Sequence, residues 1–374
     1  MNTHECLITD ESQKKLIHSF LLENFNEYGL DLSDARQRVL SQALKDSISQ
    51  QERYILQVIE RAEDIREIHK KGDFHNNQKC TIHVVRSNGA SLIYKPVSPA
   101  PLKFIDALLD LCSHGFMFER VKILSEWDDA YLCEYLVEDN PAEIDLEKYS
   151  YHFGALTLLA YIFKISDLHH ENIISSGSTP VIVDAETLFY PEVEGLKPFS
   201  FQSSLLLPGE FSHNAPAQKY GVLIQRAFES GIRQFAQNLS KHESAVQELL
   251  KQFELIKTRV ILKPTRYYQT LLKNSLHPLL LENQQNRLEY LAKCLDGNHP
   301  VTKLILENEL KALAQLDVPY FYCYSGLLFN VDDTPISLSV RAFKDQSSLS
   351  EINKSTSMLI EYSYKLNKSC NFLK

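Results

Sequence analysis

Acidic and amide side chains with the spacing of a phosphoryl-transfer site lie between residues 161 and 191. Asp167 precedes Asn172 by five positions, Asp184 follows Asn172 by twelve, and Glu186 comes two residues later. Phosphoryl transfer needs a carboxylate at the attacking hydroxyl, and Asn and Asp oxygens that hold Mg²⁺ against the phosphates. The spacing therefore predicts Asp167 as a catalytic carboxylate, with Asn172 and Asp184 as Mg²⁺ ligands. A turn or capping role fits any one of these residues but not the whole set, and it is the interpretation adopted for His170.

Two apolar elements must position this set. A nearly continuous apolar run predicts a buried helix over residues 148–165, which delivers Asp167. A turn with the sequence SSGSTP and a β-type run, PVIVD, then lead to Asp184. Protein kinases space their catalytic Asp and metal-binding Asn in the same way, and place a metal-binding Asp shortly after. Two acidic loops are therefore expected at the ends of two apolar elements that are joined by a tight connection.

The composition is that of an ordinary globular protein. The 374 residues can form a large core in two lobes or domains, with 44% hydrophobic and 23% charged residues. The net charge of −9 disfavours nucleic-acid binding, which calls for a basic face. Seven scattered cysteines without a CxxC pair predict reduced thiols in a cytoplasmic protein. Neither a signal peptide nor an apolar run long enough to span a membrane is expected.

In the N-terminal third of the chain, the spacing of apolar residues changes once, from helical to strand-like. Residues 11–70 carry apolar residues at helical spacing and predict a helical brace. Residues 71–96 contain two β-type runs, CTIHVV and SLIYK, on either side of SNGA, and Asn-Gly is a strong hairpin signal. The hairpin ends in Lys95, which is suited to contact nucleotide phosphates. Gly72, Asp73 and His75 form a polar turn before it, whose simpler interpretation is a plain loop.

The remaining sequence predicts helices with a few strands. Residues 121–136 predict two strands around a Trp-Asp-Asp turn, with Glu134 as a nucleotide contact at the link between lobes. Near Arg259, a strand VIL is expected to end at Pro264, with Thr265 capping the next helix; a solvated basic strand remains the alternative. A mobile loop is expected over 200–220 and a hairpin after 317. Helices are expected over residues 104–112, 220–255, 283–295, 302–316 and 345–374.

An ordered set of motifs resembles the dehydratase portion of class II lanthipeptide synthetases, the LanM type. The motifs are GDFH, LIYKP, DLHHEN, PVIVDAETLF, TRVILKPTRYY, NSLHP and DVPYF, between about residues 53 and 333. Members of that family phosphorylate Ser and Thr of ribosomally made peptides with ATP and then eliminate the phosphate. Their dehydratase core resembles lipid kinases, whose catalytic loop has the Asp-x-His-x-x-Asn form seen in DLHHEN.

The resemblance implies a role for each matching residue. Asp167 and His169 match the catalytic loop, while Lys95 matches a lysine that contacts phosphate. Asp73 and His75 match residues that border the active site. Asn172 and Asp184 match the Mg²⁺ ligands, with Glu186 as a neighbouring carboxylate. Arg259 and Thr265 match the residues that serve the elimination step.

Three positions depart from the family pattern. Val97 stands where the family has Arg, Gln78 where it has Gly, and Lys263 where it has an Arg. Lysine keeps the charge of arginine but not its planar fork. Part of the N-terminal region of full-length synthetases has no counterpart before Lys95, and no Cys/His set resembles the zinc site of their cyclase. The chain is therefore expected to act without a cyclase of its own.

These inferences predict an α+β, two-lobed kinase-like fold that resembles lipid kinases and carries many added helices. The expected divisions are a helical region at 1–70, a small nucleotide-binding lobe at 71–136 and a large, mostly helical lobe at 137–374. The favoured function is ATP- and Mg²⁺-dependent dehydration of a ribosomal precursor peptide, with a separate cyclase as a further partner. The alternatives are a phosphotransferase that stops before elimination and a non-catalytic adaptor that binds a peptide.

Overall fold

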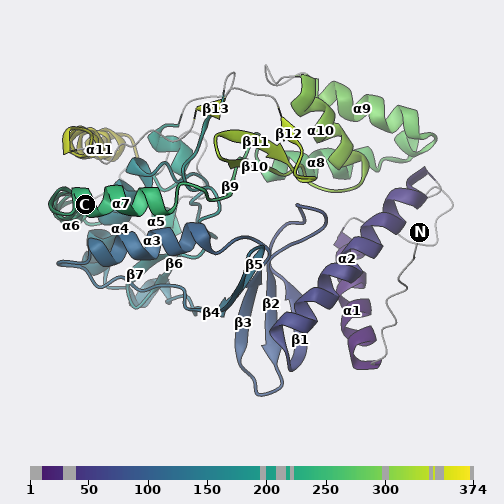
Figure 1. The fold of residues 1–374 in the computed structure, drawn as a ribbon, viewed down its shortest axis with the longest axis horizontal. Helices are drawn as coiled ribbons and strands as arrows, with labels where there is room; N and C mark the ends of the chain where they lie inside the picture. Colours follow the sequence, from purple (N-terminus) through teal and green to yellow (C-terminus); the bar gives the residue numbers. More distant parts are fainter. Residues whose placement is uncertain are drawn as a thin grey trace.

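The computed structural model describes residues 11–27, 39–193, 199–207, 216–219, 223–296, 303–336, 340–341 and 349–370. The chain is mixed α/β, and its sheets are antiparallel, which agrees with the expected α+β class (Figure 1). The kinase-like, two-lobed arrangement and the three divisions of the chain stay predictions. Helices α1 and α11 lie at opposite ends of the molecule in Figure 1.

A five-stranded sheet with the order β1-β2-β3-β5-β4 carries Lys95. The expected hairpin is confirmed, because β2 and β3 pair with Ile82 opposite Tyr94, and Gly89 in the turn has a φ of 85°. The expected pair of strands around the Trp-Asp-Asp turn is confirmed too. The strands are β1 (Ile65–Lys70), β2 (Ile82–Arg86), β3 (Ser91–Lys95), β4 (Ile123–Trp127) and β5 (Ala130–Glu134).

The prediction of helix up to residue 70 is wrong at its end. Helices α1 (Glu11–Glu27) and α2 (Ser41–Ala62) are confirmed, but residues 65–70 form strand β1. Glu63 and Asp64 have φ values of 53° and 47°, so the chain leaves the helix there and turns back. Strand β1 then pairs with β2, and this pairing satisfies the backbone N–H and C=O groups of residues 65–70 that face β2.

One face of this sheet is covered by α2 (Figure 1). Alternation along β2 and β3 turns Ile82, Val84 and Tyr94 toward the helix, where they form one core with Tyr54 and Val58. Lys95 follows Tyr94, so its side chain points to the other face of the sheet. The positioning of Lys95 therefore depends on the strand register, because a shift of one residue would turn it into the core.

The largest hydrophobic core surrounds α4 (Leu146–Ile162), as its continuous apolar sequence predicts. Helix α4 lies against α6 (Gln225–Lys241), and this contact requires glycine on both sides. A Cβ atom at Gly154 would overlap the carbonyl of Phe228, and one at Gly231 would overlap the carbonyl of Tyr151. The other elements of this region are α3 (Ala100–Leu111), η2 (Pro141–Glu143), β6 (Ile173–Ser176), β7 (Thr179–Ile182), α7 (Glu243–Gln252) and α11 (Leu349–Cys370).

A third group of elements joins α8, α9 and α10 to a sheet with the order β12-β11-β10-β9 (Figure 1). The three helices and the hairpin after residue 317 agree with the sequence prediction. The elements are β9 (Thr258–Arg259), α8 (Thr265–Ser275), η4 (Pro278–Leu281), α9 (Gln284–Asp296), α10 (Lys303–Ala314), β10 (Phe321–Tyr324), β11 (Leu327–Asn330) and β12 (Pro335–Ile336).

Two predictions near Arg259 are wrong. The strand comprises Thr258–Arg259 rather than VIL; beyond it, Val260 still donates to the carbonyl of Phe321 at 2.8 Å. Thr265 is the first residue of α8 rather than its cap, because Pro264 occupies the cap position in an extended conformation without a side-chain hydrogen bond.

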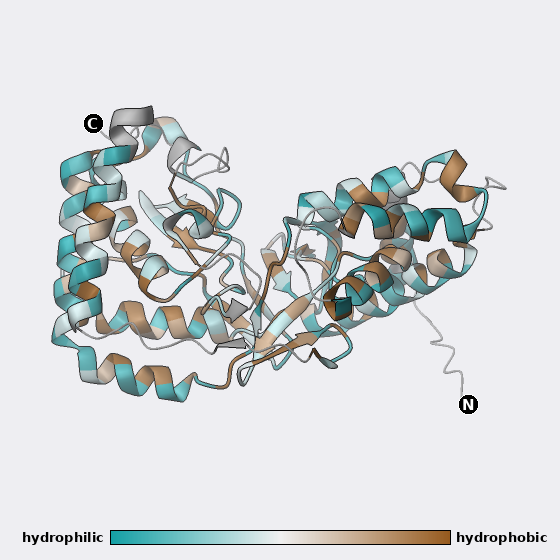
Figure 2. Cartoon of the chain, turned by 90° about the horizontal axis from the view of Figure 1, so that it is seen from above, coloured by the Kyte–Doolittle hydropathy of each residue, from teal (hydrophilic) through white to brown (hydrophobic). Residues whose placement is uncertain are grey.

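Short elements complete the described part of the chain. Of residues 200–220, where a loop was expected, the structure describes 200–207, which include η3 (Phe201–Ser204), and α5 (Pro216–Lys219). The remaining positions, 208–215 and 220, lie outside the described residues. Strand β8 (Glu192–Val193) pairs with β13 (Val340–Arg341). Hydropathy alternates between brown and teal along most helices in Figure 2. Within the described ranges, no helix combines the length and apolarity that crossing a membrane requires.

Candidate active site

The loop after α4 turns sharply and presents Asp167. Lys164 and Asp167 both adopt left-handed backbone conformations, with φ values of 48° and 58°. The loop is held from outside, because the amide of Leu168 donates to the carbonyl of Ser204 in η3 at 2.7 Å. It is held from inside as well, because Asn172 donates its side-chain amide to the carbonyl of Asp167 at 2.8 Å. The five-residue spacing of Asp167 and Asn172 thus closes one tight loop.

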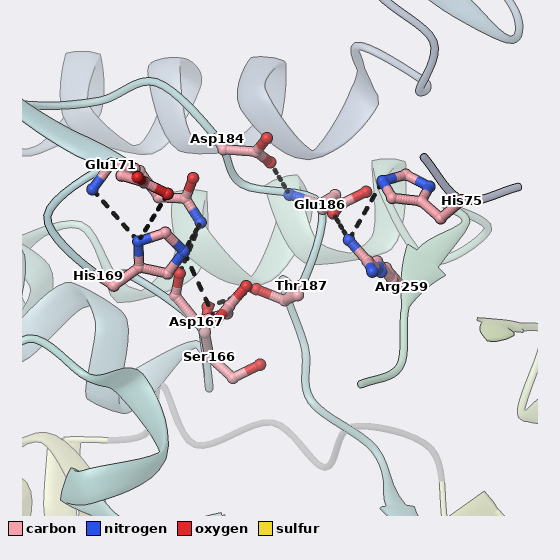
Figure 3. Close-up of polar contacts among 10 residues, drawn as sticks. His75, Ser166, Asp167, His169, Glu171, Asp184, Glu186, Thr187 and Arg259 are labelled. Atoms are coloured by element: carbon pink, nitrogen blue, oxygen red, sulfur yellow. Dashed lines mark hydrogen bonds and ion pairs between the residues drawn. The ribbon is translucent and has the colours of Figure 1, made fainter. Parts of the chain in front are cut away.

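The hairpin of β6 and β7 brings Asn172 next to the segment that carries Asp184 and Glu186. The amide of Val183 donates to the carbonyl of Asn172 at 2.9 Å, directly before Asp184. Thr187 then donates its hydroxyl to the carbonyl of Ser166, which fastens the two loops together (Figure 3). The two acidic loops that were expected at the ends of a helix and a hairpin are therefore adjacent.

Lys95 crosses from the five-stranded sheet to this pair of loops. Its ammonium donates to the carboxylate of Asp184 at 2.6 Å, and only 8% of the lysine side chain is exposed. Burial opposes the ionisation of Asp184, but the charge of Lys95 and the backbone amide of Glu186 outweigh it and lower the pKa of Asp184. Asp184 is therefore ionised at neutral pH and balanced by one buried cation.

Arg259 forms a second ion pair beside the first. Its guanidinium donates to Oε1 of Glu186, and its backbone amide donates to the carbonyl of Glu186 at 2.7 Å (Figure 3). Burial and the nearby charge of Asp184 raise the pKa of Glu186, while Arg259 opposes this shift. The second carboxylate oxygen, Oε2, is buried and has no partner among the described residues.

Burial shifts the pKa of both Asp167 and His169 in the direction that favours the neutral side chain. Burial raises the pKa of Asp167 to about 7, against the opposing charge of Arg259. Burial also lowers the pKa of His169, which therefore stays neutral at physiological pH. Nδ1 of His169 accepts from the amide of Glu171 at 3.2 Å, and its Nε2 lies 4.0 Å from Oδ1 of Asp167. A carboxyl that titrates near 7 can accept a hydroxyl proton at physiological pH.

His75 also contacts Arg259, although the two residues are distant in sequence. Its Nε2 is 3.5 Å from Nη1 of Arg259, and its ring stacks on Tyr320 with 5.4 Å between centroids. Burial and the charge of Arg259 lower the pKa of His75 well below its ordinary value, so the ring is neutral. The exposed Asp73 lies close enough for its charge to act on His169.

Two residues that the sequence assigned to the site are not joined to it by the described contacts. Thr265 begins α8, and no hydrogen bond of its side chain connects it to Arg259 within the part of the chain that the structure describes. Glu134 ends β5, and its carboxylate accepts from Lys122 at 2.9 Å rather than from a residue of the acidic loops. Their roles at the site stay predictions.

Lys263 points away from the acidic loops. Its ammonium donates to both carboxylate oxygens of Glu309 at 2.5 and 2.6 Å, and Tyr268 donates to the same carboxylate. Both charged side chains are almost fully buried. Because this ion pair is buried, Lys263 connects the segment directly before α8 to Glu309 of α10.

Sequence reasoning missed several residues around the site. Tyr320 lies against both His75 and Arg259, with Cζ of Arg259 5.5 Å from the centroid of its ring. The motif DVPYF, which contains Tyr320, was visible in the sequence but carried no assigned role. Gln78, which stands where the family has glycine, has a φ of 61°, so the position requires the left-handed conformation that glycine adopts freely.

The donors fit a magnesium ion better than a transition metal. Within the described residues, no group of three His, Cys, Asp or Glu side chains is arranged to hold a metal ion. Mg²⁺ needs fewer protein ligands, because phosphates and waters complete its shell. The ionised Asp184, the Asn172 side chain and the unpartnered Oε2 of Glu186 offer oxygen donors of this kind. Among the side chains that the structure describes, Cys80, Cys112, Cys133, Cys294 and Cys323 form no disulfide bond.

Comparisons with known proteins agree with the motifs. A family model described as "Domain of unknown function (DUF4135)" matches residues 31–222 and 211–324. A protein of Lactococcus lactis subsp. lactis, described as "Lacticin 481/lactococcin biosynthesis protein LcnDR2", is 24% identical over 360 residues. The match covers 75% of this chain and 38% of that relative, so the chain spans well under half the relative's length. These findings confirm the family resemblance that the ordered motifs indicate.

Proposed function

Since the chain belongs to the family described as Domain of unknown function (DUF4135), we propose that it takes part in lanthipeptide biosynthesis as a peptide dehydratase. The substrate is a ribosomally made precursor peptide, and the co-substrate is ATP. Ser and Thr side chains are phosphorylated first, and the phosphate is then eliminated. The description of the Lactococcus relative as a biosynthesis protein supports this proposal.

One observation carries it: two ion pairs, Lys95 with Asp184 and Arg259 with Glu186, lie side by side next to Asp167. A site for phosphoryl transfer alone needs cations and carboxylates near the γ-phosphate. The second buried cation gives the site a further place for a phosphate after transfer. Arg259 is suited to this place, because its planar fork matches a phosphate monoester.

In the first stage, Asp167 orients the peptide hydroxyl and accepts its proton, since its pKa of about 7 allows both protonation states. Lys95 donates hydrogen bonds to the phosphate chain of ATP. Asp184 and Asn172 would hold Mg²⁺, which supplies positive charge at the phosphates when it is bound. His169 stays neutral and supports the loop that carries Asp167.

In the second stage, a general base of the site accepts the α-proton of the phosphorylated residue, and the bond between Cβ and the phosphate oxygen breaks. The electrons of the Cα–H bond form the new double bond, and the phosphate departs with the electrons of the broken bond. Arg259 and Lys95 bind the departing phosphate. His75 and Glu186 both contact Nη1 of Arg259 and together keep its guanidinium in place.

A second candidate function is phosphoryl transfer without elimination. Two observations favour it. Within the described residues, no hydrogen bond joins the Thr265 side chain to Arg259, and the Arg259 guanidinium is already paired with Glu186. A separate cyclase is a proposed partner in the first function and has no part in the second.

The test is incubation of the chain with Mg²⁺, ATP and a Ser- and Thr-containing precursor peptide of the lacticin 481 type, followed by measurement of ATP consumption and intact peptide mass. The proposal expects peptide-dependent ATP consumption and the loss of one water for each modified residue. A mass gain of one phosphate without water loss would favour the second candidate. No ATP consumption would leave the adaptor alternative and overturn both.

A further inference from the structure

The loop that follows His75 has an unusual backbone. Asn76, Asn77 and Gln78 have φ values of 53°, 62° and 61°, so three consecutive residues other than glycine are left-handed. The loop is closed at its base, because His75 and Lys79 exchange backbone hydrogen bonds of 3.0 and 2.9 Å. Residues in this conformation persist only where surrounding structure holds them in place.

The carboxylate of Asp317 supplies that support. Oδ2 of Asp317 accepts from the amide of Asn77 at 2.9 Å. Burial raises the pKa of Asp317 to about 7, while hydrogen bonds from the amides of Asn77, Gln78 and Val318 oppose this shift. Converging backbone N–H groups in a turn form a site for an oxygen acceptor, and here a carboxyl oxygen of the protein itself occupies it. Asp317 lies 240 residues after Asn77 and is only 6% exposed.

The side chain of Gln78 fastens the same loop on its other side. It is 2% exposed, and its amide nitrogen donates to the carbonyl of Leu316 at 3.0 Å. Its oxygen accepts from Gln51 of α2 at 2.9 Å. The loop is therefore tied both to α2 and to the segment that ends in Asp317.

The residues after Asp317 hold His75 itself. Val318 pairs with His75 as a parallel β-bridge, and the ring of Tyr320 stacks on the His75 ring. Tyr320 also lies under Arg259. Asp317, Val318 and Tyr320 thus connect the left-handed loop, the imidazole of His75 and the guanidinium of Arg259 within four consecutive positions.

We propose that Asp317 is a positioning residue: its carboxylate holds the left-handed loop at residues 76–78 and so fixes His75 beside Arg259. It does not touch the acidic loops, and it acts only through the backbone of the loop. If His75 and Arg259 serve the elimination step, Asp317 also supports elimination, and this part rests on the proposed function. The structural part of the proposal does not depend on any activity.

The test compares Asp317→Asn with Asp332→Asn. Asp332 is a matched control, because it lies nearby but pairs with Lys311 at the surface, with 43% of its side chain exposed. Hydrogen exchange of the Asn77 and Gln78 amides should become about 10- to 100-fold faster in Asp317→Asn and stay unchanged in Asp332→Asn. NMR titration of histidine should show the pKa of His75 moving back toward its ordinary value in Asp317→Asn alone.

A rescue variant distinguishes a specific effect of Asp317→Asn on the loop from a general loss of stability. Asn77→Gly, added to Asp317→Asn, should restore part of the protection at Gln78, because glycine adopts a φ of 62° without strain. Unchanged exchange and unchanged His75 titration in Asp317→Asn would overturn the proposal. If that variant does not fold, the wild-type protein decides: the Asn77 and Gln78 amides must be protected, and exchange at the rate of open loops would overturn the proposal.

The activity arm uses the precursor peptide assay described above. Asp317→Asn should consume ATP at a rate close to that of the wild type and accumulate phosphorylated peptide, with elimination about tenfold slower. Wild-type protein that consumes no ATP would overturn the proposed function, while the exchange and titration results would still decide the role of Asp317. If the Asn77 and Gln78 amides exchange faster in Asp317→Asn but the variant eliminates phosphate at the wild-type rate, the proposed effect of Asp317 on elimination is wrong.

Discussion

Arg259 donates to Glu186 twice, once from its guanidinium to the carboxylate and once from its backbone amide to the carbonyl at 2.7 Å. The side-chain bond is therefore fixed by the backbone bond beside it, which leaves Arg259 little freedom to turn away. Glu186 is two residues from Asp184, the partner of Lys95. Each cation that could bind phosphate is thus held by a carboxylate on one short segment, and substrate phosphate must compete with these carboxylates.

Asp184→Asn should abolish ATP consumption, because the variant removes the ionised oxygen donor that pairs with Lys95. The loss should be at least about 100-fold, the scale of removing one preorganised electrostatic group. Asp110→Asn is the control, since that carboxylate pairs with Arg120 at the surface and is 69% exposed. Turnover of ATP by Asp184→Asn at the wild-type rate would remove Asp184 from the site.

Glu309→Gln should lower the free energy of unfolding by about 3–5 kcal/mol, because it leaves the buried ammonium of Lys263 facing a neutral group. Chemical denaturation measures the change. Lys311→Met serves as the control, since its pair with Asp332 is exposed and should contribute less than about 1 kcal/mol. Equal effects of the two variants would mean that the Lys263–Glu309 pair is not a structural fastening.

Gly154→Ala and Gly231→Ala should each destabilise the protein by about 3 kcal/mol or more, because the new methyl group would overlap a carbonyl of the facing helix. Gly72→Ala is the matched control: its φ is not positive, and the nearest atom to a new Cβ is Cβ of Thr81 at an ordinary 3.6 Å. Thermal unfolding of the three variants checks the prediction. A mild effect at Gly154 and Gly231 would contradict the close contact of α4 with α6.

Asp106→Asn should stabilise the protein, and more so at high pH. Burial raises the pKa of Asp106 to about 6, with Asp110 adding to the shift and Arg120 opposing it. A carboxyl whose folded pKa is raised weakens the folded state as the pH rises through that value. The gain should be about 1–2 kcal/mol at pH 8, after allowance for partial exposure, and should vanish near pH 4. A gain that is independent of pH would contradict the assignment of the titrating group.

Many of the helices and strands could be predicted from local sequence patterns. The Asn-Gly turn was enough to predict the β2–β3 hairpin that ends in Lys95, and the apolar run before Asp167 was enough to predict α4. Strand β1 escaped prediction because its sequence also suits a helix, and only its pairing with β2 decides the matter. For the same reason the VIL strand was misplaced: which residues of the segment pair depends on β10.

The candidate site was less predictable than the elements that carry it. The motif spacing located Asp167, Asn172 and Asp184 because all three lie on one local unit of helix and hairpin. The contact of His75 with Arg259 joins residues that are 184 positions apart, and that of Asn77 with Asp317 joins residues 240 apart. No periodicity reports such pairs, since they depend on how separate elements pack.

The central claim is that the site both transfers and eliminates phosphate, and intact-mass analysis of the precursor peptide with Arg259→Ala tests it most directly. Losing one charge-assisted contact to the departing phosphate should slow elimination by about 10- to 100-fold, while Asp167 and Asp184 still act on ATP. The wild type should therefore yield peptide that has lost water, and Arg259→Ala should yield peptide that has gained phosphate. Normal dehydration by Arg259→Ala would contradict the account, and so would a wild-type product that carries phosphate alone.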